Sequence, residues 1–162
     1  MISFFVAGIP IAKGSAKAFV IKGTNRAIVT QTNREKQRPW ASIIGVTAQQ
    51  LNKPMIEGPV SLSLAFVLPR PKNHYGTGKQ SSVLKLSAPF WHTSKPDSDK
   101  LTRLVLDALT GITWKDDSQV AHFGHISKTY GDVPGVHIEI IPTSGAKKMY
   151  RFPGDMGWKS SY

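Results

Sequence analysis

The amino-acid sequence predicts a single α+β domain, in which helices pack on one face of a mixed β-sheet. A chain of 162 residues can bury one hydrophobic core without help from disulfides or zinc. Segments with the composition or two-residue period of strands occur on both sides of two segments with helical composition or period. Strands and helices mixed in this order are typical of helices layered on one sheet.

The N-terminal part of the chain is predicted to contain three strands and one helix. Residues 2–7 are large and apolar and stop at a glycine and a proline, which indicates a buried strand. Residues 18–22 and 27–31 form the two arms of a predicted hairpin around a Gly-Thr-Asn-Arg turn. Residues 34–51 have the composition of a helix, and we expect Pro39 in its first turn.

The following part is predicted to add a strand, a long loop, a helix and two more strands. Residues 60–67 alternate apolar with small or polar side chains, the pattern of a strand with one buried face. Residues 70–94 contain no acid and no regular period, so we expect a mobile loop that faces the substrate. Residues 98–110 place apolar side chains along one helical face, and strands follow at 120–130 and 135–141.

These segments define a folded domain of residues 1–142 and a basic, aromatic tail of residues 143–162. The tail lacks any period, and the sequence does not choose between disorder, contact with a partner subunit and contact with nucleic acid.

The net charge of +11 is concentrated in residues 1–96, where 13 Lys and Arg face two acids. Long acid-free stretches in a chain of pI near 10 are expected of a protein that binds a phosphate backbone. The alternative is ordinary solubility charge. The absence of cysteine excludes disulfides and cysteine-based catalysis, and no apolar run has the length of a membrane span. We therefore expect a soluble, cytoplasmic protein.

Residues 95–120 hold five of the ten acidic residues in this basic chain. Asp97 precedes the predicted helix, Asp99 lies in its first turn, and Asp116 and Asp117 lie in the turn after it, which can return beside the helix start. Clustered carboxylates are the hard oxygen ligands that Mg²⁺ or Mn²⁺ prefers. The window therefore predicts a metal-dependent enzyme that acts on a polyanion.

Each acid also has a structural explanation. Asp97 could cap the helix, Asp99 could interact with the helix dipole, and Asp116 could form a turn. Asp107 shares the outward face with Asp99 and Arg103 and could pair with Arg103. The sequence leaves these explanations open.

Basic side chains near the acidic window are candidates for phosphate contacts, and nearby aromatic side chains could stack on unpaired bases. The basic candidates are Lys13, Lys17, Arg70, Lys72, Lys79, Lys85, Lys95 and Lys100. The aromatic candidates are Tyr75, Phe90 and Trp91, although Phe90 and Trp91 could instead be core or dimer contacts. His122 and His125 are three apart on a predicted strand, so we expect them on opposite faces and not in a zinc site.

Three segments resemble the RusA-type Holliday junction resolvases, which are found in phages and prophages. The resemblance lies in residues 97–103, 106–111 and 114–120, and in a Gly-x-Pro-x-x-Lys-Gly opening at residues 8–14. It implies a homodimeric, Mg²⁺-dependent endodeoxyribonuclease that makes paired nicks in four-way DNA junctions during recombination and repair. A phage-encoded member would act in the host-cell cytoplasm. The family's catalytic, metal-binding aspartates correspond to Asp97, Asp99 and Asp117, with Asp116 beside them.

Two positions depart from the family pattern. Lys100 replaces the usual asparagine, and Arg103 replaces the catalytic lysine. Arginine keeps the positive charge and can hold a phosphate with two parallel bonds, but it does not readily lose a proton. We therefore expect Arg103 to clamp the scissile phosphate. Two alternatives stay open: a non-catalytic junction-binding protein on the same fold, and a metal nuclease that acts on flaps or RNA.

Overall fold

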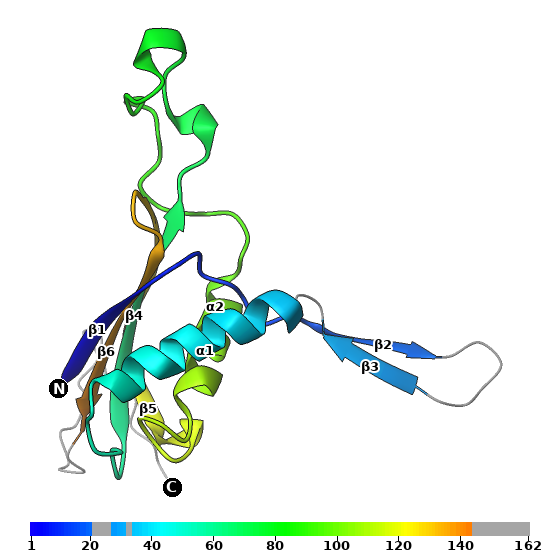
Figure 1. Cartoon of the computed structure of the whole chain (residues 1–162), viewed down its shortest axis with the longest axis vertical. Coiled ribbons are helices and arrows are strands. Elements are labelled where there is room, and N and C mark those ends of the chain that lie inside the picture. Colours follow the sequence, from blue (N-terminus) through cyan, green and yellow to red (C-terminus); the bar gives the residue numbers. More distant parts are fainter. Residues whose placement is uncertain (21–26, 32–33, 144–162) are drawn as a thin grey trace, which may run out of the picture.

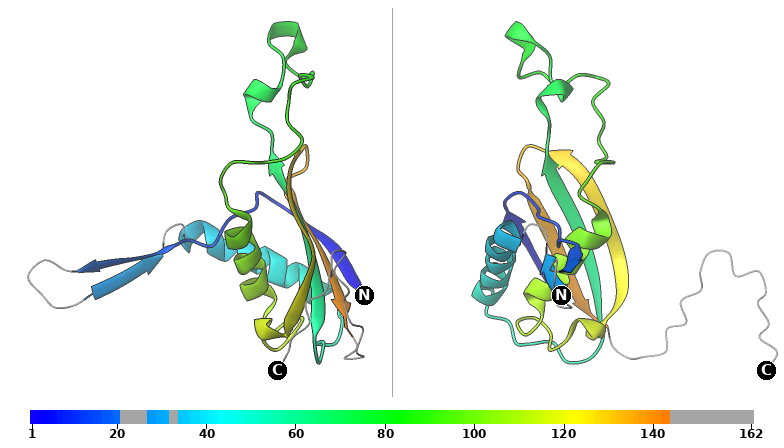
Figure 2. Two further views of the ribbon diagram at one scale, coloured as in Figure 1. Left: turned by 180° about the vertical axis from the view of Figure 1, so that it is seen from behind. Right: turned by 90° about the vertical axis from the view of Figure 1, so that its right-hand side faces the viewer.

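The computed structural model describes residues 1–20, 27–31 and 34–143, with the side chains of residues 16–34 outside that description. Its body is a four-stranded sheet with two helices on one face, as Figures 1 and 2 show. The α+β fold predicted from the sequence is confirmed. No helix in the described ranges has the length and hydropathy needed to cross a membrane.

The strands of the sheet are β1 (Ile2–Ala7), β4 (Val60–Pro69), β5 (Val120–Gly131) and β6 (Gly135–Pro142), in the order β1-β6-β4-β5. β4 pairs with β5 in parallel, while β6 is antiparallel to both β1 and β4. The strands β5 and β6 are joined by a short turn, yet they lie on opposite sides of β4. The strand β4 therefore lies between two strands that follow each other directly in the sequence.

The core lies between the sheet and the helices α1 (Arg34–Gln50) and α2 (Ser98–Leu109). Alternate side chains of β4, from Val60 to Leu68, are buried beneath the helices, as the two-residue period predicts. α2 buries Leu101, Leu104, Val105 and Leu109 along its apolar face. The side chains of Asp99, Arg103 and Asp107 are exposed, as expected for the opposite face.

Pro39 lies in the second turn of α1, not in the first turn as we expected. Its missing N–H leaves one carbonyl of the first turn without a helical partner. The ring of Trp40 contacts Gly8, whose φ of +139° suits glycine and where an added Cβ would lie 2.6 Å from the indole. This contact joins the start of the chain to α1.

Two segments extend from the body (Figure 1). The strands β2 (Ala16–Val20) and β3 (Ala27–Gln31) pair as an antiparallel hairpin, with β2 starting two residues earlier than predicted. Residues 70–94, the projecting loop, extend past the end of the sheet and contain the short 3₁₀ helices η1 (Lys72–His74) and η2 (Gly78–Gln80). The start of α2 lies at the base of both extensions.

The expectation that His122 and His125 lie on opposite faces of the sheet was wrong. Two register shifts in β5 pair His122 with Ser61 and His125 with Ser63, and these serines lie on the same face of β4. Ser61 Oγ and His122 Nδ1 are 2.8 Å apart, which confirms the facing of that pair. Both histidines therefore lie on the sheet face away from the helices, because the bulges reset the two-residue alternation.

Candidate active site at the start of helix α2

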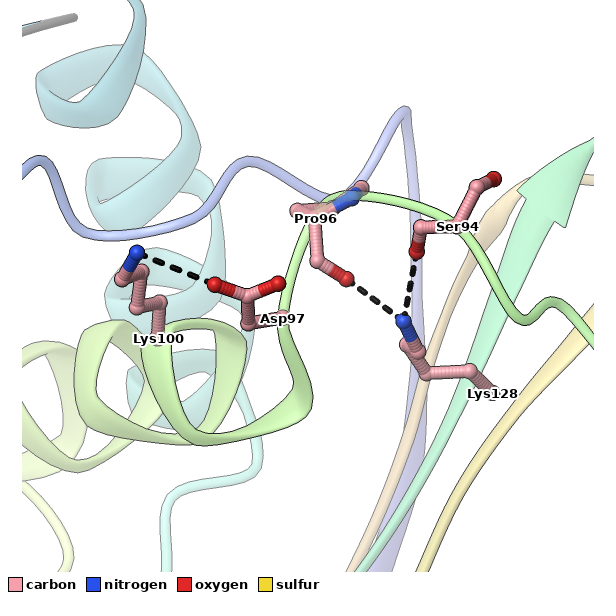
Figure 3. Close-up of polar contacts among 5 residues, drawn as sticks. All are labelled: Ser94, Pro96, Asp97, Lys100 and Lys128. Atoms are coloured by element: carbon pink, nitrogen blue, oxygen red, sulfur yellow. Dashed lines mark hydrogen bonds and ion pairs between the residues drawn. The ribbon is translucent and has the colours of Figure 1, made fainter.

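Asp97 occupies the N-cap position of α2 with an extended backbone, but its carboxylate makes no capping hydrogen bond. It forms an ion pair with Lys100 instead, with 3.0 Å between Asp97 Oδ2 and Lys100 Nζ (Figure 3). The helix-capping explanation for this carboxylate therefore fails. The side chain remains half exposed and available to a ligand.

The ion pair also determines the electrostatics at this point. The hydrogen bond from Lys100, followed by the charge of Lys100, lowers the pKa of Asp97. The reciprocal hydrogen bond and charge of Asp97 raise the pKa of Lys100, and the charge of Asp99 raises it further. One ammonium thus interacts with both carboxylates at the start of α2, in a position where it can compete with a metal cation.

Lys128 of β5 holds the segment that leads into α2. Its Nζ donates hydrogen bonds to the carbonyls of Ser94, at 2.8 Å, and Pro96, at 2.6 Å (Figure 3). Lys128 was not among the candidates predicted from the sequence. A signal was present, because Lys128 shares the two-residue period of Ile126 and Tyr130 in the predicted strand. The structure pairs it with the buried Phe66. The hydrogen bonds position Asp97 relative to the sheet.

A pocket of about 330 Å³, called here the α2 pocket, opens beside Asp97. Lys13, Lys95 and Lys100 contribute cationic side chains to its lining, and Asp97 contributes the carboxylate. A pocket lined by lysines beside a carboxylate has the chemistry that suits a phosphate accompanied by a cation.

Lys13 connects the N-terminal loop to α2 in two ways. Its backbone N donates to the Lys100 carbonyl at 3.0 Å, and its Nζ lies 2.5 Å from Asp107 Oδ2. The suggestion that Asp107 pairs with Arg103 is therefore wrong, because Lys13 is its partner. Arg103 lies between Lys100 and Asp107 in the sequence of α2. Its side chain is exposed and forms no ion pair with any residue that the structure describes.

Asp116 has a structural role at the other end of α2. It caps η3 (Asp117–Gln119): its Oδ1 accepts a hydrogen bond from Ser118 N at 2.9 Å, and Gln119 completes a capping box. The hydrogen bonds from Ser118 lower the pKa of Asp116. The turn-forming explanation is therefore correct for Asp116. Asp117 is the first residue of η3 and is exposed.

The expected return of this turn to the start of α2 does not occur within one chain. Gln119 bonds to the carbonyls of Ile56 and Gly58, at the beginning of β4, whereas Asp97 follows the segment held by Lys128. Val120 and Lys128 pair with Val60 and Phe66, which lie six positions apart on β4, and this corresponds to about 20 Å of strand. No three His, Cys, Asp or Glu within the described ranges lie close enough to share a metal ion.

The carboxylates at the start of α2 nevertheless fit one kind of metal. Mg²⁺ is commonly held by one or two carboxylates, with water and substrate phosphate as its other ligands. Asp97 lines the α2 pocket and Asp99 is exposed in the first turn of α2, so either carboxylate could contribute one ligand, and the lysines of the pocket would attract the phosphate. The donor set therefore suits Mg²⁺ or Mn²⁺ with DNA present.

The remaining candidate cations lie in the two extensions. Lys72 and Lys79 are exposed in the projecting loop, and Lys85 Nζ donates to the Asn73 carbonyl at 2.9 Å. Arg70 Nη1 donates to the Pro89 carbonyl at 2.9 Å, so it stabilises the base of this loop. The side chain of Lys17 and the tail from residue 144 lie outside the described residues.

Comparison with known families identifies the chain. A model of the family described as endodeoxyribonuclease RusA matches residues 10–141, which include the α2 pocket and both ends of α2. This chain belongs to the RusA endodeoxyribonuclease family. The resemblance noted in the sequence is thereby confirmed, and RusA membership implies an endodeoxyribonuclease that binds branched DNA.

One relative of this RusA family member is the uncharacterized protein YqaN of Bacillus subtilis (strain 168). It is 32% identical over 147 residues, which cover 88% of this chain and 97% of YqaN. The similarity therefore spans the fold and is not confined to the acidic window.

Proposed function

We propose that this protein is a Mg²⁺-dependent endonuclease that resolves four-way DNA junctions by paired, symmetrical nicks. The observation that supports this most directly is the Asp97 carboxylate. It occupies a helix N-cap without capping the helix, and it faces a pocket lined by three lysines. RusA family membership supplies the reaction class.

The side chains around the α2 pocket have separate roles in this proposal. Asp97 and Asp99 hold the metal, which supplies charge stabilisation and an activated water when bound. Lys13 and Lys95 attract the DNA backbone, and the exposed guanidinium of Arg103 clamps the scissile phosphate. Lys100 shields Asp97 until a cation replaces it.

Asp117 is proposed as a further metal ligand, and its position makes the homodimer part of the proposal. Because Asp117 lies beyond the far end of α2 from Asp97, it can reach a metal at Asp97 only from a second chain. Two chains would form two such sites, as paired nicks in a two-fold symmetric junction require.

The test is a junction-nicking assay on purified protein with and without Mg²⁺. We expect Asp97→Asn to lower the nicking rate by about a hundred-fold or more, because a metal ligand is lost. Junction binding should persist, since the lysines remain. Asp132→Asn, which removes one exposed carboxylate in the β5–β6 turn, is the control and should nick normally.

The same assay separates the alternatives. Tight junction binding with no Mg²⁺-dependent nicking by the wild-type protein would identify a non-catalytic junction-binding protein. A panel of junctions, flaps, duplexes and RNA would show whether another nucleic acid is cut faster. Faster cutting of a flap or RNA than of a four-way junction would overturn the proposed substrate.

A further inference from the structure

The projecting loop exposes large apolar side chains that the core does not explain. Its residues Val83, Leu84, Leu86, Phe90 and Trp91 are all exposed. Phe90 and Trp91 expose 59% and 56% of their surface, so the structure excludes the interpretation that they are core residues. Large apolar side chains that gather on one exposed segment are typical of a binding surface.

The backbone beneath these two rings is held firmly. Tyr130 N donates to the Phe90 carbonyl at 3.0 Å, and His92 N donates to the Lys128 carbonyl at 3.0 Å. Trp91 forms a bridge with Thr129. Residues 90–92 therefore add a short antiparallel segment to the free edge of β5, and the rings project from a fixed backbone.

The base of the loop is packed as well. The ring of Tyr130 lies 4.8 Å from that of His74 and 4.6 Å from that of His92, and the Arg70 guanidinium lies 5.5 Å from its centroid. His92 is buried. Phe90 and Trp91 contact each other edge-on, with 5.0 Å between centroids. The pair is thus preorganised, and binding to it would lose little conformational entropy.

The charge around the rings selects the class of partner. Residues 58–96 contain no acid, while Lys72, Lys79 and Lys95 are exposed along the same segment. A partner that offers both negative charge and flat apolar faces is a nucleic acid with accessible bases. A second copy of this basic chain matches the charge less well, because it would bring like charge to the interface.

The rings also lie close to the proposed cutting site. Asp97 follows Trp91 by six positions, so their Cα atoms are at most about 20 Å apart. Lys128 holds the connecting segment through Ser94 and Pro96. Bases within a few steps of the scissile phosphate could therefore reach the aromatic pair.

We propose that Phe90 and Trp91 form a stacking platform for bases that are unpaired at the branch point of DNA bound in the α2 pocket. This inference rests on the proposed function, since it takes the nuclease substrate as its ligand. The platform would favour branched DNA over continuous duplex, because a duplex keeps its bases stacked on one another.

The test measures DNA binding without metal, so that no cutting interferes. The probes are a four-way junction with 2-aminopurine at the branch point and a duplex of the same sequence. We expect Trp91→Ala and Phe90→Ala each to weaken junction binding about five-fold or more and to abolish the fluorescence change of 2-aminopurine. Duplex affinity should change less than two-fold. Leu86→Ala, an exposed apolar position in the same loop, is the control and should bind normally.

Unchanged junction affinity and fluorescence in both aromatic variants would overturn the platform. Sedimentation that shows the Trp91→Ala protein as monomer where the wild type is a dimer would overturn it in favour of a second copy. Circular dichroism checks that each variant is folded. The two proposals fail separately: a wild type that binds the junction through Trp91 but does not nick it contradicts only the proposed function, and normal nicking without any effect of Trp91 contradicts only the platform.

Discussion

Asp97 and Lys100 form an ion pair at the start of α2, which a divalent cation would have to displace in the proposed function. The contact of 3.0 Å involves two half-exposed side chains, so it is weak enough to be displaced. When a phosphate enters the α2 pocket, it offers Lys100 a second anionic partner. DNA binding and metal binding should then support each other, because each removes a competitor of the other.

The first prediction at this scale concerns Lys100→Gln. Removing the ammonium should strengthen Mn²⁺ binding to the DNA-free protein by a factor of about two to five, the range expected for an exposed ion pair. Electron paramagnetic resonance of free Mn²⁺ measures the affinity. Lys95→Gln is the control, because Lys95 lines the same pocket and makes no ion pair in the described chain. Equal affinities of wild type and Lys100→Gln would contradict direct competition.

Arg103 supplies a second prediction at the residue scale. If its guanidinium clamps the scissile phosphate, Arg103→Ala should lower the nicking rate by about ten- to a hundred-fold, and Arg103→Lys should retain an intermediate rate. Single-turnover nicking of a four-way junction measures both. Equal rates in the wild type and both variants would exclude the clamp.

At the scale of elements, α2 and η3 differ in what their polar residues do. At the start of α2, the Asp97 carboxylate does not cap the helix and pairs with Lys100, whereas η3 uses Asp116 and Gln119 for its own structure. Gln119 Nε2 donates to the carbonyls of Ile56 and Gly58, and its Oε1 accepts from the backbone N of Lys115 and Asp116. One amide thus joins the turn after α2 to the beginning of β4.

Gln119→Ala should therefore destabilise the fold. Four backbone groups would lose their protein partner, and we expect the free energy of unfolding to fall by about 1–3 kcal/mol. Urea denaturation followed by tryptophan fluorescence measures the change, since Trp114 is buried nearby in the chain. Asp117→Asn, at an exposed position of the same element, should change stability by less than about 0.5 kcal/mol. A Gln119→Ala protein as stable as the wild type would show that water replaces these bonds.

At the scale of the whole molecule, the separation of Asp97 from Asp117 determines how many chains the proposed active site needs. A single described chain does not bring three acidic or histidine ligands together. In the proposed homodimer, each site would combine the start of α2 from one chain with η3 from the other. Activity would then depend on association, as it does wherever a site lies between subunits.

Mixed dimers test this arrangement. Asp97→Asn and Asp117→Asn homodimers should both be inactive in the nicking assay. A heterodimer of the two, isolated by different affinity tags, should regain one intact site and nick one strand per junction. An inactive heterodimer would show that both aspartates act within the same chain, whereas an active Asp117→Asn homodimer would show that Asp117 is not a ligand.

Local patterns in the sequence were sufficient for most of the secondary structure and for locating the acidic window, whose role as a ligand set stays a prediction. The alternation in residues 60–67 and the helical stripe of residues 98–110 are set by neighbours a few positions apart, and both predictions are confirmed. The position of Asp97 just before the helix also follows from neighbouring residues. The interaction partners do not follow from neighbouring residues, because Asp107 bonds to Lys13 and Lys128 holds Pro96 across long stretches of chain.

Local patterns specify the strands, the helices and the concentration of acid in a basic chain, because these features depend on backbone period and composition. What they left open depends on the packing of distant segments: the insertion of β4 between β5 and β6, the bulges that turn His122 and His125 to one face, and the distance from Asp97 to Asp117. The physical reason is that a strand or helix is stabilised by near neighbours, whereas its place in the sheet follows from burying the shared core.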